Sequence, residues 1–175
     1  MKTLYFHGFD SSREKSTTYK ALKEILGSVD CYSIDYTKEN VTESEKIENI
    51  KQYNVLIGNS FGGFPALYFG LKERIPFMLI NPAVNPTEVL LKHGIKSVLY
   101  KNSEKQLKQM IDEELEKNRV KKTIIISKND DVVDNSIILN TGLTEISTFI
   151  ETEWTHRIPK DGIPMIAEEL KRLAD

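Results

Sequence analysis

Short apolar runs alternate along this chain with longer amphipathic stretches, as they do in repeated βα units. Two of the runs, 55–57 and 124–126, are uninterrupted, which is typical of parallel strands that helices cover on both faces. The sequence therefore predicts an α/β fold with a mostly parallel central sheet between two helical layers, a three-layer αβα sandwich. The predicted strands are residues 2–6, 30–34, 54–58, 76–80, 123–127 and 145–150.

Helix signals separate these predicted strands. The first helix has an apolar face that begins at Tyr19, and Gly27 is placed to end it. Residues 42–45 and 103–106 both match the capping box, in which a hydroxyl and a carboxylate or amide bind the free N–H groups of a helix start. The last helix is expected to begin near Pro164, a residue suited to a first helical turn.

Residues 1–175 are expected to form a single α/β domain, because they contain no repeat, low-complexity tract or Gly/Ser linker. Residues 84–118 depart from the βα rhythm, because about 35 residues separate two strands there, more than a simple crossover needs. This insertion is expected to form either a small cap over the site or two packed helices without a functional role.

The composition argues against some classes of partner and indicates a cellular compartment. The formal net charge of −2 and the interleaved lysines and carboxylates give no basic face, so no nucleic-acid partner is expected. The single cysteine, Cys31, excludes an internal disulfide and fits a reducing compartment. No stretch has the roughly 20 apolar residues of a membrane span, and the start lacks a signal peptide, so a cytoplasmic protein without a membrane partner is expected.

The segment 58–63 matches the nucleophile elbow, G-x-S-x-G, with Ser60 as its serine. An apolar run precedes it and a helix-forming run follows, which is the context that this motif requires. Gly58 and Gly62 are needed because the residues two before and two after the serine lie against neighbouring backbone. The alternatives are an ordinary strand-to-helix turn and, less well matched in its glycine spacing, a phosphate-binding loop.

The loop after the first strand contains His7, Gly8 and Phe9. In a hydrolase with this elbow, that loop supplies one backbone N–H of the oxyanion hole and the residue after the nucleophile supplies the other. The predicted donors are therefore the N–H groups of Phe9 and Phe61, and Gly8 lets the backbone approach the substrate. His7 is expected to brace the loop by hydrogen bonds and not to act as a base.

A general base and its orienting acid should follow the serine in the order Ser, Asp or Glu, His. His156 lies beyond the last predicted strand, where the base is expected, whereas His93 lies in the irregular insertion and is interpreted as a loop or cap residue. Asp130 is the preferred acid and Asp131 the alternative, while Asp131 or Asp134 is expected to cap the next helix. No metal site is expected, because the ligands needed to complete one are not suitably spaced.

The placement of these residues supports the assignment. The His-Gly loop, the serine, the aspartate and the histidine each follow a predicted strand directly. Open α/β sheets bind their ligands at the carboxyl ends of the strands, so these four elements should meet at one edge.

The same blocks resemble the compact YqiA/YcfP-like esterases of bacteria, a branch of the α/β-hydrolase fold. The resemblance spans almost the whole chain and rests on residues 5–12, 58–63, 81–86, 127–130 and 155–157. It implies carboxylic-ester hydrolysis without a cofactor, activity on short acyl or thioester substrates, and a triad of Ser60, Asp130 and His156. Some relatives lack the elbow serine, which this chain retains.

The sequence thus predicts a serine esterase that hydrolyses short-chain carboxylic esters through an acyl-enzyme intermediate. The expected partner is a small-molecule ester or thioester, with no metal or other cofactor. One alternative is a binding or regulatory protein that keeps the fold without turnover. The other is a thioesterase or acyltransferase that uses the same triad on a carrier-bound acyl group.

Overall fold

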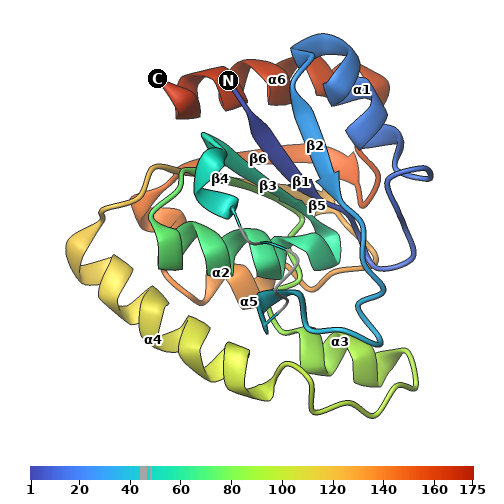
Figure 1. Cartoon of the computed structure of the whole chain (residues 1–175), viewed down its shortest axis with the longest axis vertical. Helices are drawn as coiled ribbons and strands as arrows, with labels where there is room; N and C mark the ends of the chain where they lie inside the picture. The colour runs from blue at the N-terminus through green and yellow to red at the C-terminus, as the bar shows by residue number, and fades with distance from the viewer. Residues whose placement is uncertain (44–46, 48) are drawn as a thin grey trace.

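The computed structural model of this chain describes residues 1–43, 47 and 49–175. Within these residues six strands form one sheet in which every pairing is parallel, in the order β2-β1-β3-β4-β5-β6. The predicted α/β class and parallel sheet are therefore confirmed (Figure 1). The strands are β1 (Thr3–Phe6), β2 (Val29–Tyr32), β3 (Val55–Asn59), β4 (Phe77–Ile80), β5 (Lys122–Asn129) and β6 (Thr148–Thr155).

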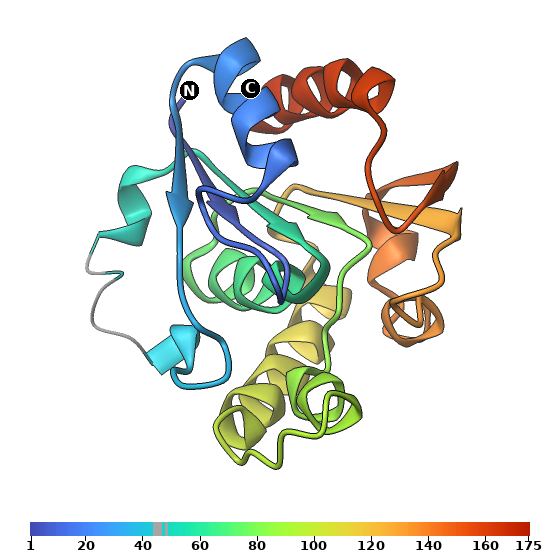
Figure 2. The same cartoon turned by 90° about the vertical axis from the view of Figure 1, so that its right-hand side faces the viewer.

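Helices cover both faces of the sheet, as the three-layer prediction requires (Figure 2). The helices α1 (Thr17–Leu26) and α6 (Ile163–Ala174) pack on one face, where Leu22 and Leu170 join the buried side chains of β1 and β3. The helices α2 (Gly63–Glu73) and α4 (Lys101–Lys117) lie on the other face, over a second apolar cluster. The short helices α3 (Pro86–Lys92) and α5 (Ser136–Leu139) contribute Leu90 and Ile138 to that second cluster.

The helix boundaries follow the local chemistry of the sequence. Ser16 begins α1, because its hydroxyl accepts a hydrogen bond from the N–H of Tyr19. Gly27 ends this helix with a φ of 74°, a value that a residue without a side chain adopts at little cost. Pro164 lies in the first turn of α6, as predicted. Single 3-10 turns occur at Val41–Glu43, Ile50–Gln52, Ser60–Gly62, Leu143–Ile146 and Lys160–Gly162.

Two sequence predictions were wrong in this part of the fold. The last strand was expected at 145–150 but runs over Thr148–Thr155, because Ile146 belongs to the 3-10 turn Leu143–Ile146 and the strand continues through polar, partly exposed residues. Ser103 does not begin a helix, since α4 already starts at Lys101. Its hydroxyl is buried and binds the side chains of Asn40 and Thr42. The capping box expected at 42–45 falls partly outside the described residues.

The insertion at 84–118 consists of α3, a connecting loop and α4, which lie together below the sheet in Figure 1. Glu104 of α4 joins the two helices, because its carboxylate accepts hydrogen bonds from both the N–H and the hydroxyl of Thr87 at 2.8 Å. Tyr100, at the start of α4, is buried and donates to the carbonyl oxygen of Glu39. The insertion is thus attached to the body of the domain, and its role as a cap stays a prediction. None of the helices formed by the described residues has the length and apolar character to cross a membrane.

Candidate active site

The turn after β3 has the geometry of a nucleophile elbow. Ser60 has a φ of 54°, in the left-handed region that residues with a side chain rarely adopt. A Cβ atom at Gly58 would lie 2.3 Å from the carbonyl oxygen of Gly62, and one at Gly62 would lie 2.2 Å from that of Phe6. Both distances are far below van der Waals contact, so glycine is required at each position for the turn to form.

Gly63 has the same property, although the motif did not single it out. A Cβ atom there would lie 2.5 Å from Cβ of Pro82, because the start of α2 packs against the loop after β4. The N–H of Ala83 in that loop donates to the carbonyl oxygen of Ser60 at 3.0 Å. The second glycine of the Gly-Gly pair therefore permits a contact between the elbow and residues 82–83.

Three side chains from three different loops meet at the carboxyl edge of the sheet. Nε2 of His156 lies 3.1 Å from Oγ of Ser60. Nδ1 of the same imidazole lies 3.0 and 2.9 Å from the two carboxylate oxygens of Asp130. The structure thus brings together the three residues that the sequence analysis grouped, in a continuous chain of hydrogen bonds from carboxylate to hydroxyl.

The surroundings of Asp130 hold its carboxylate in an acceptor role. Its side chain is fully buried, and Oδ1 also accepts hydrogen bonds from the N–H groups of Val132 and Val133 at 2.9 and 3.0 Å. Asp131 is exposed, and Asp134 accepts a hydrogen bond from the N–H of Ser136 at the start of α5. Of these three carboxylates, the one at His156 is that of Asp130. The N-cap residue of α5 is Asn135, so neither Asp131 nor Asp134 occupies the capping position that was expected for one of them.

Asn81 is a further residue that organises the site and that the motifs did not reveal. It is fully buried at the end of β4 with a φ of 44°. Its side-chain oxygen accepts from the N–H of Ser127 at 2.8 Å, and its amide nitrogen donates to the carbonyl oxygen of His156 at 3.3 Å. Asn81 therefore ties β4 to β5 and to the loop that carries the imidazole.

His7 is buried and braces the loop after β1, which confirms its predicted structural role. Its Nδ1 lies 2.7 Å from the carbonyl oxygen of Gly8, and its Nε2 accepts from the N–H of Ile34 at 3.2 Å. These two partners require a neutral ring with the proton on Nδ1. Burial lowers the pKa of His7 below its ordinary value of 6.5, which agrees with that state.

Gly8, Phe9 and Phe61 surround the serine. A Cβ atom at Gly8 would lie 3.3 Å from Cβ of Ser60, so the glycine brings this loop close to the elbow. The N–H of Phe61 lies in the first turn after β3. The N–H groups of a first helical turn have no carbonyl oxygen within the helix to accept their hydrogen bonds. The rings of Phe9 and Phe61 are 5.5 Å apart, so the two loops expected to provide an oxyanion hole pack directly against each other.

A cavity of about 540 Å³ opens beside Ser60 and His156. Phe9 and His93 form one wall, and the start of α1 with its preceding loop forms another. Most of the remaining lining side chains are polar: Asp10, Ser11, Lys15, Ser16, Thr17, Thr18, Asn59 and Arg157. Among the residues that the structure describes, no cluster of three or more His, Cys, Asp or Glu side chains is arranged to bind a metal ion.

Several solved structures share this fold. The fluorophosphonate-binding serine hydrolase F of Staphylococcus aureus is 14% identical with a TM-score of 0.70, over 99% of this chain and 83% of that one. Est1E from Butyrivibrio proteoclasticus is 14% identical with a TM-score of 0.68, over 98% of this chain and 87% of that one. These similarities show that the chain has the α/β-hydrolase fold.

Sequence comparison places the chain in a family. A UPF0227 protein of Shewanella woodyi is 27% identical over 180 residues, which cover 97% of this chain and 96% of that protein. The family described as uncharacterised protein family UPF0227 matches residues 2–173. The predicted resemblance is thereby confirmed, and the chain belongs to the UPF0227 family.

Proposed function

We propose that this protein is a serine esterase that hydrolyses carboxylic esters with short acyl chains through an acyl-enzyme intermediate. The observation that carries the proposal is the chain of hydrogen bonds from Asp130 through His156 to Ser60. A hydroxyl hydrogen-bonded to an imidazole that a buried carboxylate orients is the arrangement that activates serine as a nucleophile.

In the first half of the reaction, Nε2 of His156 takes the hydroxyl proton while Oγ of Ser60 bonds to the ester carbonyl carbon. The carbonyl π electrons move to the oxygen, and the Asp130 carboxylate stabilises the imidazolium through the proton on Nδ1. The tetrahedral intermediate then reforms its carbonyl as the bond to the alcohol oxygen breaks. The imidazolium returns its proton to that oxygen, which leaves as the alcohol.

The second half repeats these steps with water. His156 takes a proton from the water molecule as its oxygen attacks the acyl-enzyme carbonyl. Collapse of the second intermediate breaks the bond to Oγ, which regains its proton from the imidazolium, and the carboxylic acid departs. In both halves the backbone N–H groups of Phe9 and Phe61 donate to the negatively charged oxygen.

The cavity supports the preference for short acyl chains. A volume of about 540 Å³ is within the usual range for a small-molecule site, but ligand pockets are ordinarily lined mainly by apolar side chains. Here Phe9, Val132 and Ile158 are the large apolar residues among the described residues of the lining. A long aliphatic chain would therefore leave much of its surface against polar groups or in water.

Labelling with a fluorophosphonate probe tests the proposal, because only an activated serine hydroxyl reacts readily with it. We expect labelling of the native protein and of Ser11→Ala, which alters another hydroxyl of the same cavity, and none of Ser60→Ala. Turnover of p-nitrophenyl acetate should fall by something on the order of a millionfold in Ser60→Ala. A folded native protein without labelling or turnover would instead support a binding or regulatory role.

A series of p-nitrophenyl esters from acetate to palmitate, measured beside the corresponding acyl-CoA thioesters, tests the substrate class. The proposal expects the highest kcat/KM for the short oxygen esters. Faster turnover of the thioesters would favour the thioesterase or acyltransferase alternative while leaving the nucleophile unchanged.

A further inference from the structure

Val132 presents an exposed apolar side chain beside the three hydrogen-bonded residues of the site. It lines the same cavity as Ser60 and His156, and 64% of its surface is exposed. Its N–H donates to Oδ1 of Asp130 at 2.9 Å, and the Asp130 carboxylate in turn contacts Nδ1 of His156. Two hydrogen bonds thus connect the backbone of Val132 to the imidazole. Because valine branches at Cβ, its side chain has few rotamers, so this apolar surface is largely fixed before a substrate binds.

Ile158 supplies a second apolar side chain to this cavity. It lies two residues after His156, is half-buried, and packs against the buried cluster under α1 and α6. Val132 and Ile158 therefore come from the two loops that carry the proposed acid and base. Most of the polar lining side chains, at 10–11 and 15–18, come instead from the loop after β1 and the start of α1.

The proposed reaction determines which part of an ester lies next to these two loops. When the first tetrahedral intermediate collapses, Nε2 of His156 donates its proton to the alcohol oxygen, so that oxygen must lie within about 3 Å of Nε2. The negatively charged oxygen lies instead at the N–H groups of Phe9 and Phe61. The group attached to the alcohol oxygen therefore begins at the imidazole, next to the loops that contain Val132 and Ile158.

We infer that Val132 and Ile158 form an apolar subsite for the alcohol portion of the ester, so that the enzyme selects short-chain acyl esters of apolar alcohols. This inference rests on the proposed esterase function. An alkyl group that covers Val132 removes exposed apolar surface from water, which favours the bound and transition states over the free enzyme. Each methylene group that becomes fully buried there raises kcat/KM by up to about fourfold.

Three esters test this subsite, with their hydrolysis followed as acid release at constant pH. Butyl acetate and methyl valerate are isomers that carry the added chain on opposite sides of the ester group, and methyl acetate is the reference for both. In the native chain we expect kcat/KM for butyl acetate to exceed that for methyl acetate about tenfold. Val132→Ala should lower this ratio about threefold to tenfold, while the ratio of methyl valerate to methyl acetate should stay within about twofold of its native value.

Two further variants serve as controls. Val132→Thr keeps the branched shape and the backbone hydrogen bond to Asp130 but exchanges a methyl group for a hydroxyl, so it should also lower the ratio of butyl to methyl acetate. Val98→Ala makes the same truncation at a valine that is 72% exposed in the insertion and is not among the described residues that line the cavity, so it should keep the native ratio. Each ratio compares two substrates on one variant, so a general loss of activity affects both substrates and cancels.

Three results would overturn the inference and leave the esterase proposal standing. The first is a native ratio of butyl to methyl acetate in both Val132 variants. The second is a fall for methyl valerate as large as that for butyl acetate, which would place the acyl chain at Val132. The third is an equal fall in Val98→Ala, which would show that the effect is not local to the cavity. Absence of turnover and of probe labelling in the native chain would instead refute the esterase proposal, so the two failures are distinguishable.

Discussion

The buried carboxylate of Asp130 faces Nδ1 of His156 with both oxygens, at 2.9 and 3.0 Å. Such a contact requires the proton of a neutral imidazole to be on Nδ1, which leaves the lone pair of Nε2 free to accept the Ser60 proton. The same carboxylate accepts two backbone N–H groups, so its orientation does not depend on the imidazole.

Replacing Asp130 by Asn should preserve the geometry of the site but remove most of its catalytic activity. The amide can present an N–H to the imidazole, which favours the tautomer with its proton on Nε2 and removes the charge that stabilises the imidazolium. We expect kcat for p-nitrophenyl acetate to fall about 10⁴-fold. Asp131→Asn is the matched control, because this neighbouring carboxylate is exposed, and it should retain nearly native kcat. Comparable losses in the two variants would contradict the role of Asp130.

Asn81→Ala should weaken both the fold and the catalytic step. The substitution leaves the buried N–H of Ser127 without its acceptor, which costs about 1–3 kcal/mol of unfolding free energy. It also removes the bond to the carbonyl oxygen of His156, so the imidazole should be less well positioned and kcat should fall about tenfold. Urea denaturation and steady-state kinetics measure the two effects separately. A native free energy of unfolding together with a native kcat would show that the two hydrogen bonds of the Asn81 side chain are not needed.

The sequence could predict the three hydrogen-bonded residues of the site, but not the residues that hold their loops in place. Ser60, Asp130 and His156 each follow a strand, and parallel strands end at one edge, so their meeting place could be predicted from chain order. Asn81 and Gly63 matter because of contacts with distant segments, such as Ser127 and Pro82, and no local pattern reports such contacts.

The wrong strand boundary has a similar physical origin. β6 lies at the edge of the sheet, and its side chains alternate between exposed and half-buried, so it carries charged residues such as Glu151 and Glu153. The predicted strand begins too early because it includes Ile146, an apolar residue that belongs to the turn Leu143–Ile146. Ile146 is half-buried against the core, so its hydrophobicity indicated contact with the core but not that the residue lies in a turn.

His7 should make stability depend on pH. Its lowered pKa in the folded state means that, below the ordinary value of 6.5, the unfolded chain binds a proton that the folded protein resists. The contribution of His7 to the free energy of unfolding should therefore be fully present above pH 6.5. It should decrease as the pH falls from that value toward the pKa of His7 in the folded protein. Protonation of Nε2 would also place an N–H against the N–H of Ile34.

The expected slope for this one group is at most about 1.4 kcal/mol per pH unit. It is measured as the difference in unfolding free energy between mildly acidic and neutral buffer, for the native chain and for His7→Gln. The variant lacks the titrating ring, so the difference between the two slopes isolates His7. Identical slopes would show that protonation of this ring is not linked to folding.

The charges around the cavity should make the enzyme favour esters that carry an anionic group. Lys15 and Arg157 line the cavity beside Ser60, and neither forms an ion pair with another described residue. Asp10 also lines it, so the exposed lining side chains carry more positive than negative charge, while the Asp130 carboxylate is buried behind His156. Relative to p-nitrophenyl valerate, the carboxylate-bearing mono-p-nitrophenyl glutarate should therefore gain in kcat/KM.

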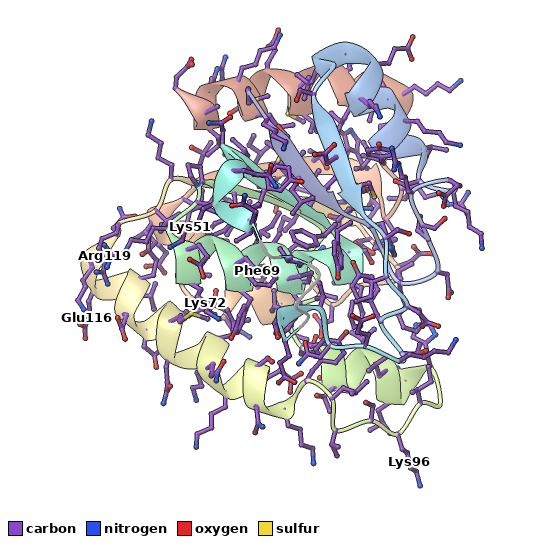
Figure 3. All side chains as sticks on the ribbon, viewed as in Figure 1. Lys51, Phe69, Lys72, Lys96, Glu116 and Arg119 are labelled. Carbon is purple, nitrogen blue, oxygen red and sulfur yellow. The ribbon has the colours of Figure 1, made fainter. Side chains whose placement is uncertain are left out.

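Removing both cations by Lys15→Ala with Arg157→Ala should lower the ratio of kcat/KM for the anionic ester to that for the neutral ester by about threefold to tenfold. Asp10→Asn should raise this ratio, since it removes the opposing charge. The matched control is Lys96→Ala with Arg119→Ala, which makes the same change in net charge at two residues outside the described cavity lining. Figure 3 shows Lys96 pointing away from the body of the protein beyond α3, and Arg119 at the far end of α4. If both double variants shift the ratio equally, the selectivity reflects overall charge and not the cavity.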